Sequence, residues 1–111
     1  MEVVSYPRRD EVWLVALDPS KGSEIKKTRP CLVVSPDEMN EPLQTALVAP
    51  MTTTVRGYPT RVNLTFNKKA GQVALDQLRA VDRQRLVRKL GTISAKTAHE
   101  VFSVLAEMFV R

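Results

Sequence analysis

Short apolar segments separated by frequent turn formers run along most of this chain. Residues 11–17 are β-branched and aromatic and too few for an average helix, which predicts a strand. In residues 61–66, Val62, Leu64 and Phe66 alternate with polar residues, so this strand should place one face on a core and the other in water. Further strands or short apolar runs are expected at residues 30–35, 45–51, 72–75, 78–81 and 91–93.

The end of the chain has a different period. Ser94 is a good N-cap, and apolar residues then recur at helical spacing, which predicts an amphipathic C-terminal helix. The apolar stripe comprises Ala98, Val101, Phe102, Leu105, Ala106 and Phe109. A brief helix is also expected at residues 83–89. Many short strands and one terminal helix indicate a mainly β fold, a small curved antiparallel sheet or barrel with a helix packed on it.

Two connections interrupt these elements with charged residues. Residues 18–28 contain turn formers and charges with almost no apolar side chain, which predicts a long exposed loop of the kind that often carries function. Asp37, Glu38 and Glu41 form an acidic stretch, interpreted as a connection on the other side of the molecule. No repeat or linker divides the 111 residues, so we expect a single domain over residues 1–111.

Basic residues outnumber acidic ones, 17 against 12, for a net charge of +5. They gather in three groups: Lys21, Lys26, Lys27 and Arg29; Arg56, Arg61, Lys68 and Lys69; and Arg79, Arg83, Arg85, Arg88 and Lys89. Concentrated positive charge suits a groove that follows a polyanionic backbone, although plain solubility would explain the net charge equally well.

The inventory of reactive side chains is small. With one histidine and one cysteine, the chain lacks the ligands for a zinc site and the partners for a Cys–His pair, and no cluster of carboxylates indicates a magnesium site. Cys31 lies within an apolar strand and is expected to act as a small buried hydrophobe. We therefore expect no metal and no cofactor. The reactions left open are those in which the substrate brings its own nucleophile, as RNA does through its 2′-hydroxyl.

Arginine is well suited to neutralise charge in such a reaction, because its planar fork donates to two oxygens and stays charged. Arg29 stands where the charged loop meets a buried strand, which makes it the leading candidate, although a solvated charge before a strand is an equally good reading. Thr52 and Thr53 end another strand and are able to supply hydroxyl groups, but β-branched polar residues also suit strand ends.

Several motifs, in order and at similar spacing, resemble the MazF/PemK family of toxins. They are the segments Asp18–Glu24, Thr28–Pro36, Val48–Thr53, Arg56–Pro59 and Val73–Gln77, followed by Arg79 and Asp82. The resemblance implies an SH3-like barrel of the MazF/PemK/CcdB type, a homodimer, and an interface groove that binds RNA. It also implies cleavage of single-stranded mRNA at short motifs without metal, leaving 2′,3′-cyclic phosphate and 5′-hydroxyl ends.

By position, Arg29 matches the family's catalytic arginine and Thr52 its catalytic threonine. The PemK branch carries a histidine in the first loop and an arginine two residues before the Asp–Gln pair, where this chain has Ser23 and Ala74. The resemblance therefore implies the MazF arrangement, with a proton path through solvent or Thr52. The other residues expected to bind RNA or line the site are Lys21, Glu24, Lys27, Thr53, Arg56, Tyr58, Asp76, Gln77 and Arg79.

Single-stranded RNA binders commonly stack bases on aromatic side chains. Tyr58, in an exposed turn, is the better stacking candidate, whereas Trp13 is expected in the core. The resemblance further implies an acidic, disordered antitoxin (MazE-like) that covers the positive groove. Because no run of about 18 apolar residues occurs, we expect a cytoplasmic location without membrane contact. Two alternatives stay open: a CcdB-like gyrase poison, and an SH3-like module that binds nucleic acid without cutting it.

Overall fold

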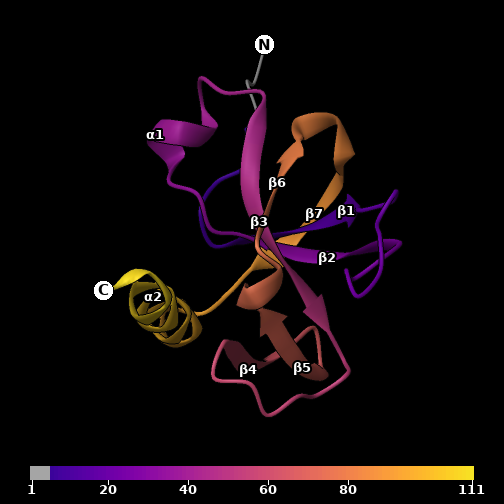
Figure 1. Cartoon of the computed structure of the whole chain (residues 1–111). Coiled ribbons are helices and arrows are strands. Elements are labelled where there is room, and N and C mark those ends of the chain that lie inside the picture. The colour runs from indigo at the N-terminus through magenta and orange to yellow at the C-terminus, as the bar shows by residue number, and fades with distance from the viewer. Residues whose placement is uncertain (1–5) are drawn as a thin grey trace.

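The structure is a computed structural model in which residues 6–111 are described (Figure 1). Its strands are β1 (Glu11–Ala16), β2 (Thr28–Val33), β3 (Thr45–Thr52), β4 (Arg61–Phe66), β5 (Lys69–Ala74), β6 (Arg79–Asp82) and β7 (Leu86–Thr92). Its helices are α1 (Asp37–Asn40) and α2 (Ala95–Phe109), with two 3-10 turns, η1 (Leu75–Gln77) and η2 (Arg83–Arg85).

One antiparallel sheet joins all the strands, in the order β4-β5-β3-β2-β1-β7, with β6 also paired to β3. The long strand β3 is central: its first half pairs with β6 and its last two residues with β5, while β2 lies along its other edge. The hairpin of β4 and β5 therefore extends from one end of β3, at the bottom of Figure 1, and β6 and β7 from the other. This is the expected mainly β, strongly curved fold.

Two apolar clusters lie on opposite faces of the sheet, since neighbouring residues of one strand divide between them. Leu32 belongs to the first cluster, beneath α2, and the adjacent Cys31 and Val33 to the second. Trp13 is half-buried against the second cluster, and its indole N–H donates to Glu11 Oε1 at 2.9 Å. Trp13 therefore packs against the core, as predicted, without being fully buried in it.

The prediction of a short helix at residues 83–89 was wrong. Asp82 accepts the N–H of Gln84 at 2.8 Å and caps only the short turn η2, after which the chain continues as β7 along β1. The register of β7 against β1 shifts twice, and the apolar residues of β7 do not alternate with polar ones. Most of this strand therefore has no recognisable pattern in the sequence. The acidic stretch lies in the connection from β2 to β3, as expected, and contains the single turn α1.

Helix α2 begins as predicted, with Ser94 Oγ accepting the N–H of Thr97 at 3.1 Å. Ala98, Val101, Phe102 and Leu105 pack on the first cluster, together with Val104 and Met108. Ala106 and Phe109, also expected on this stripe, are exposed. The packed face runs as far as Met108 and leaves Ala106 and Phe109 of the predicted stripe uncovered. Within residues 6–111, no helix is long and apolar enough to cross a membrane.

Candidate active site

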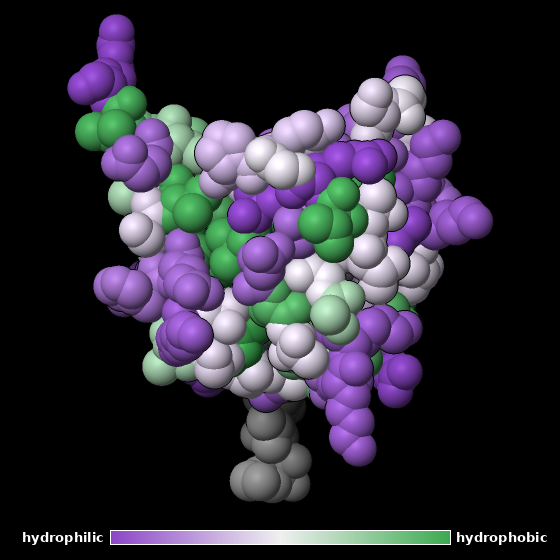
Figure 2. Space-filling view, turned by 90° about the horizontal axis from the view of Figure 1, so that it is seen from below, coloured by the Kyte–Doolittle hydropathy of each residue, from purple (hydrophilic) through white to green (hydrophobic). Residues whose placement is uncertain are grey.

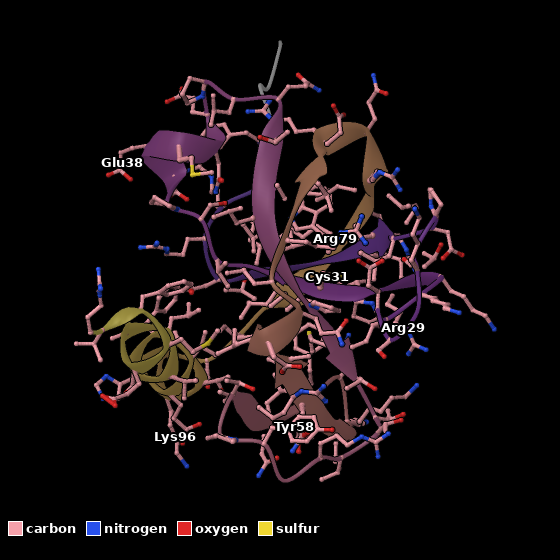
Figure 3. The ribbon with its side chains drawn as sticks, viewed as in Figure 1. Arg29, Cys31, Glu38, Tyr58, Arg79 and Lys96 are labelled. Carbon is pink, nitrogen blue, oxygen red and sulfur yellow. The ribbon has the colours of Figure 1, made fainter. Side chains whose placement is uncertain are left out.

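A groove of about 670 Å³ opens between the start of β2 and the connection from β3 to β4. One wall is the loop between β1 and β2, and the other carries Tyr58 and Arg61. Its lining residues are Ser23, Glu24, Ile25, Lys26, Lys27, Arg29, Thr52, Thr54, Arg56, Tyr58, Arg61, Asp76 and Gln77. In Figure 3, Arg29 lies beside the start of β2 and Tyr58 in front of β4 and β5, while Glu38 lies on the far side of the molecule.

Strands β2 and β3 bring Arg29 and Thr52 together. Cys31 pairs with Pro50 in this antiparallel ladder, so continuing the register by two residues places Arg29 opposite Thr52. Arg29 Nε donates to the Lys26 carbonyl at 2.9 Å, and its two terminal nitrogens have no partner within residues 6–111. Thr52 Oγ1 accepts the N–H of Thr54 at 3.1 Å, which leaves its own hydroxyl proton available.

The same two residues also border a smaller depression of about 220 Å³ on the side of β4 and β5. This depression is more apolar, with Met51, Leu64 and Phe66 among its lining residues. Gly71 also lines it. Only glycine fits at this position, because a Cβ there would lie 2.5 Å from the Thr52 carbonyl oxygen. Arg29 and Thr52 therefore stand on a ridge between a large charged groove and a small apolar one.

The loop wall is fixed at its base by arginine hydrogen bonds to main-chain carbonyls. Arg79 Nη1 donates to the Leu17 carbonyl at 3.2 Å, and Arg85 Nη1 donates to those of Ala16 and Asp18. The Lys27 N–H donates to Asp18 Oδ1 at 3.1 Å, closing the loop on itself. These bonds hold the loop in place but occupy two of the arginines that were expected to serve a polyanion.

The middle of this loop is held by one side chain from another part of the chain. Gln77 Oε1 accepts the N–H of Ile25 at 2.8 Å, and Gln77 Nε2 donates to the Ser23 carbonyl at 3.2 Å. Within the loop, Glu24 Oε1 accepts the N–H of Lys21 at 2.6 Å. Both ends of the Gln77 amide are thus engaged with the loop.

On the opposite wall, Asp76 is bonded to the residues that begin β4. Arg61 Nε and Nη2 donate to the two carboxylate oxygens at 2.7 and 3.1 Å, and Thr60 Oγ1 donates to Oδ1 at 3.1 Å. The hydrogen bond from Arg61 is the main cause that holds the pKa of Asp76 below its usual range, and the same bond raises the pKa of Arg61. The Arg61 guanidinium lies 5.0 Å from the centre of the Tyr58 ring.

Consecutive residues of η1 therefore reach opposite walls of the groove, Asp76 the Tyr58 side and Gln77 the loop side. The acidic and amide side chains that the sequence placed in the site are both occupied by protein contacts in this structure. Their first effect is to position the two walls.

The structure places most of the expected site residues in the main groove: Glu24, Lys27, Arg29, Thr52, Arg56, Tyr58, Asp76 and Gln77. Thr53 lines the smaller apolar depression, and Arg79 an adjoining hollow of about 430 Å³ (Figure 3). Lys21 lines neither the groove nor these two depressions among the described residues.

The sequence reasoning missed five lining residues: Ser23, Ile25, Lys26, Thr54 and Arg61. Four of them neighbour residues that were named, so treating the loops as whole segments would have included them. Arg61 was named in the second basic group and as a polar position of an alternating strand, but not as a residue of the site. The signal for it was its place beside the Tyr58 turn, at the start of that strand.

Cys31 lies beneath this site but is fully buried, and burial raises the pKa of its thiol to about 12. A thiol that stays protonated is a poor nucleophile, so Cys31 acts as a small hydrophobe, as predicted. Among residues 6–111, no three His, Cys, Asp or Glu side chains gather as a metal-binding group. The surface seen from the β4–β5 end is mainly hydrophilic, with hydrophobic side chains in small separate patches (Figure 2).

Comparisons with known proteins agree with this architecture. The chain is 37% identical to the endoribonuclease toxin MazF of Escherichia coli (strain K12) over 86 residues, which cover 77% of each chain. Its structure is similar to that of MazF from Deinococcus radiodurans, with a TM-score of 0.83, 28% identity and coverage of 95% and 97% of the two chains.

A MazE-MazF structure from the same organism is also similar, with a TM-score of 0.74, 26% identity and coverage of 95% and 96%. The model of the family described as PemK-like, MazF-like toxin of type II toxin-antitoxin system matches residues 8–109, which include every strand, both helices and the whole groove. The chain therefore belongs to the PemK-like, MazF-like toxin family.

Proposed function

We propose that this protein is an endoribonuclease toxin that cuts single-stranded mRNA at a short sequence motif. The observation that carries the proposal is that Arg29, at the start of β2, and Thr52, at the end of β3, both line the same positively charged groove. The relative from Escherichia coli is named an endoribonuclease toxin, which supports the same activity here. Such a groove follows a phosphate backbone while leaving the bases open to side-chain contacts.

In the proposed reaction, the RNA 2′-oxygen attacks the adjacent phosphorus and loses its proton, while the bond from phosphorus to the 5′-oxygen breaks. The 5′-oxygen takes up a proton, so the products are a 2′,3′-cyclic phosphate and a 5′-hydroxyl. Charge accumulates on the phosphate oxygens in the transition state. The terminal nitrogens of Arg29 are available to donate to these oxygens, because only its Nε is engaged within the protein.

Thr52 has the second role. Its hydroxyl accepts from the Thr54 N–H, which orients the oxygen and directs its proton toward the ridge. There it donates to the scissile phosphate and connects the 2′-hydroxyl or the leaving oxygen to solvent. The proton path therefore runs through Thr52 and water, and needs no histidine in the groove.

The test is to incubate the purified protein with a long unstructured RNA in excess EDTA and to map both new ends of every fragment. We expect cuts at one short motif with cyclic phosphate and 5′-hydroxyl ends. A single 2′-deoxynucleotide on the 5′ side of the cut should abolish cleavage there, because the nucleophile is missing. Intact RNA across many sequences, or 5′-phosphate ends, would overturn the mechanism and leave binding without cleavage.

We further propose that the protein acts as a homodimer in the cytoplasm and is inhibited by an acidic antitoxin peptide. The similar MazE-MazF structure from Deinococcus radiodurans is of a toxin with its antitoxin, and a positive groove suits an acidic, disordered segment. Light scattering should give twice the mass of one chain. An acidic peptide from the partner should compete with RNA, and a peptide that binds without competing would contradict this part.

The gyrase-poison alternative is less favoured, because the match to the toxin family spans residues 8–109 and the ridge keeps both Arg29 and Thr52. The remaining alternative, a module that binds RNA without cutting it, predicts steep salt dependence and no fragments. The mapped ends decide between them.

A further inference from the structure

Arg61 is unusual among the cations that line the groove, because its charge is already neutralised. Its side chain is only 7% exposed and forms a two-pronged ion pair with Asp76, at 2.7 and 3.1 Å. The pair raises the pKa of Arg61 and lowers that of Asp76, so both groups stay ionised and bonded at neutral pH. A guanidinium fixed in this way is a poor phosphate ligand, since binding RNA would require breaking the pair.

What Arg61 does contact is the ring of Tyr58. Its guanidinium lies 5.0 Å from the ring centre, within the range of a cation–π interaction, and the main-chain N–H of Arg61 donates to the Tyr58 carbonyl at 3.1 Å. Tyr58 is nevertheless 50% exposed and lines the groove. One face of the ring is thus covered by Arg61, while much of the residue remains open to solvent.

Tyr58 is also the single aromatic side chain among the residues that line the main groove. An exposed aromatic ring beside a row of cations has the chemistry of a stacking site for a nucleobase, with the cations holding the backbone. An exposed tyrosine normally loses rotamer freedom when a ligand stacks on it. Support from Arg61 reduces that loss because the ring is already held. Arg61 is itself fixed by Asp76, whose carboxylate also accepts the hydroxyl proton of Thr60.

We infer that Arg61 is a positioning residue that holds Tyr58 as a stacking platform for one base of the RNA motif. The platform consists of Tyr58, Arg61 and Asp76, and it takes a nucleobase on the free face of the Tyr58 ring. This inference rests on the proposed function, since it concerns how the same groove binds its RNA. One base of the RNA motif is therefore expected to bind at the wall of the groove opposite the loop.

The experiment pairs protein variants with RNA that lacks one base. Starting from the mapped motif, each nucleotide is replaced in turn by an abasic one, and kcat and KM are measured for wild type and Tyr58→Ala. At one position, base removal should lower wild-type kcat/KM between about fivefold and about 150-fold, the range of base–aromatic stacking. On intact RNA, Tyr58→Ala should lower kcat/KM by the same factor. Removing the base at that one position should then cause no further loss in this variant.

The Arg61 variants test the positioning role. In Arg61→Ala, removing the same base should lower kcat/KM by a smaller factor than in the wild type, because KM for intact RNA is already raised while kcat changes little. Arg61→Lys should restore the wild-type factor only in part, because lysine lacks the planar fork. Tyr58→Phe keeps the ring and should keep the coupling. Lys96→Ala, an exposed charge on α2 (Figure 3), serves as the matched control for loss of one cation.

Thermal unfolding shows whether Arg61→Ala is folded; if it is not, Tyr58→Ala and Arg61→Lys still decide the outcome. If Tyr58→Ala and base removal lower kcat/KM by factors that multiply at every position, the inference is overturned, although the RNA is still cut. Absence of any cleavage by the wild type would instead be a failure of the proposed function. The two failures are therefore distinguishable.

Discussion

The arginines of the groove and those at the β6–β7 end of the molecule look alike in the sequence but serve different purposes. At the β6–β7 end, Arg79, Arg83 and Arg85 all donate to main-chain carbonyls of distant loops. In the groove, the side chain of Arg56 has no hydrogen bond among the described residues, and Arg29 has only one. The set of arginines at the β6–β7 end fixes the fold, whereas the set of Arg29 and Arg56 is available to a ligand. Arg61, the third arginine of the groove, is already paired with Asp76.

The difference teaches that clustered positive charge is not by itself a binding surface. The carbonyls that Arg83 and Arg85 reach lie up to 43 and 69 residues away along the chain. Nothing local in the sequence shows whether an arginine will meet such an acceptor. Replacing residues of each set in turn should therefore separate effects on activity from effects on stability.

The largest effect is expected for Arg29→Ala. Loss of one charged group that stabilises a transition state typically costs about 10²–10³-fold in kcat, so cleavage should fall by at least that factor. Thermal stability should hardly change, since the variant loses one exposed hydrogen bond to Lys26. Steady-state cleavage and calorimetry on the same sample check both. Equal cutting by the variant would remove Arg29 from the mechanism.

The opposite result is expected for Arg83→Leu. This change removes hydrogen bonds to the carbonyls of Asn40 and Glu41, on the α1 side away from the groove, and should cost about 1–3 kcal/mol of unfolding free energy. Cleavage per folded molecule should stay at the wild-type level. Urea denaturation and activity measurements test it, and a loss of kcat without a loss of stability would show that the two sets are not distinct.

Salt dependence distinguishes the sets at the level of binding. With a non-cleavable RNA carrying 2′-deoxyribose at the cut site, Lys27→Ala or Arg56→Ala should each lower the slope of log Kd against log salt by about 0.7. Both residues line the groove. Lys96→Ala should leave the slope as it was. An unchanged slope in both groove variants would mean that these cations do not meet phosphate.

The smallest effect concerns the ion pair of Arg61 and Asp76. The pKa of Asp76 is lowered from its ordinary value of 3.8, so the pair stabilises the fold at neutral pH and this contribution is lost as pH falls through the lowered pKa. A double-mutant cycle with Arg61→Met and Asp76→Asn should give a coupling of about 1 kcal/mol at pH 7. The coupling should disappear in strong acid; a coupling that persists there would exclude the charge interaction.

Local patterns in the sequence were enough to predict much of the fold. The alternation over β4 and the Ser94 cap of α2 depend on neighbouring residues, and both elements formed where they were expected. Only the end of β7 was predicted, within residues 91–93, because the shifted register of this strand against β1 removes the period of two before that. The exposure of Phe109 was missed because the sheet, not the helix itself, decides which face of the helix is covered, and the adjacent Met108 packs on the first cluster instead.

The candidate site divides in the same way. Arg29 and Thr52 were named by resemblance, and the ladder of β2 and β3 explains why the two lie together. The role of Arg61 was hidden, because its partner Asp76 lies 15 residues later and meets it only when β5 folds back on β4. Contacts of this kind depend on the assembled sheet and leave no local pattern.

The turn η1 has a mechanical consequence. Since Asp76 is bonded to one wall and Gln77 to the other, a segment of three residues sets the distance between the walls. A 3-10 turn advances by about a third of a revolution per residue, so inserting one residue here would point both side chains away from their partners. Both walls would lose the contact that ties them to this turn, while the residues of the walls themselves would be unchanged. The width of the groove is therefore able to evolve separately from its chemistry, and with it the shape of RNA that fits.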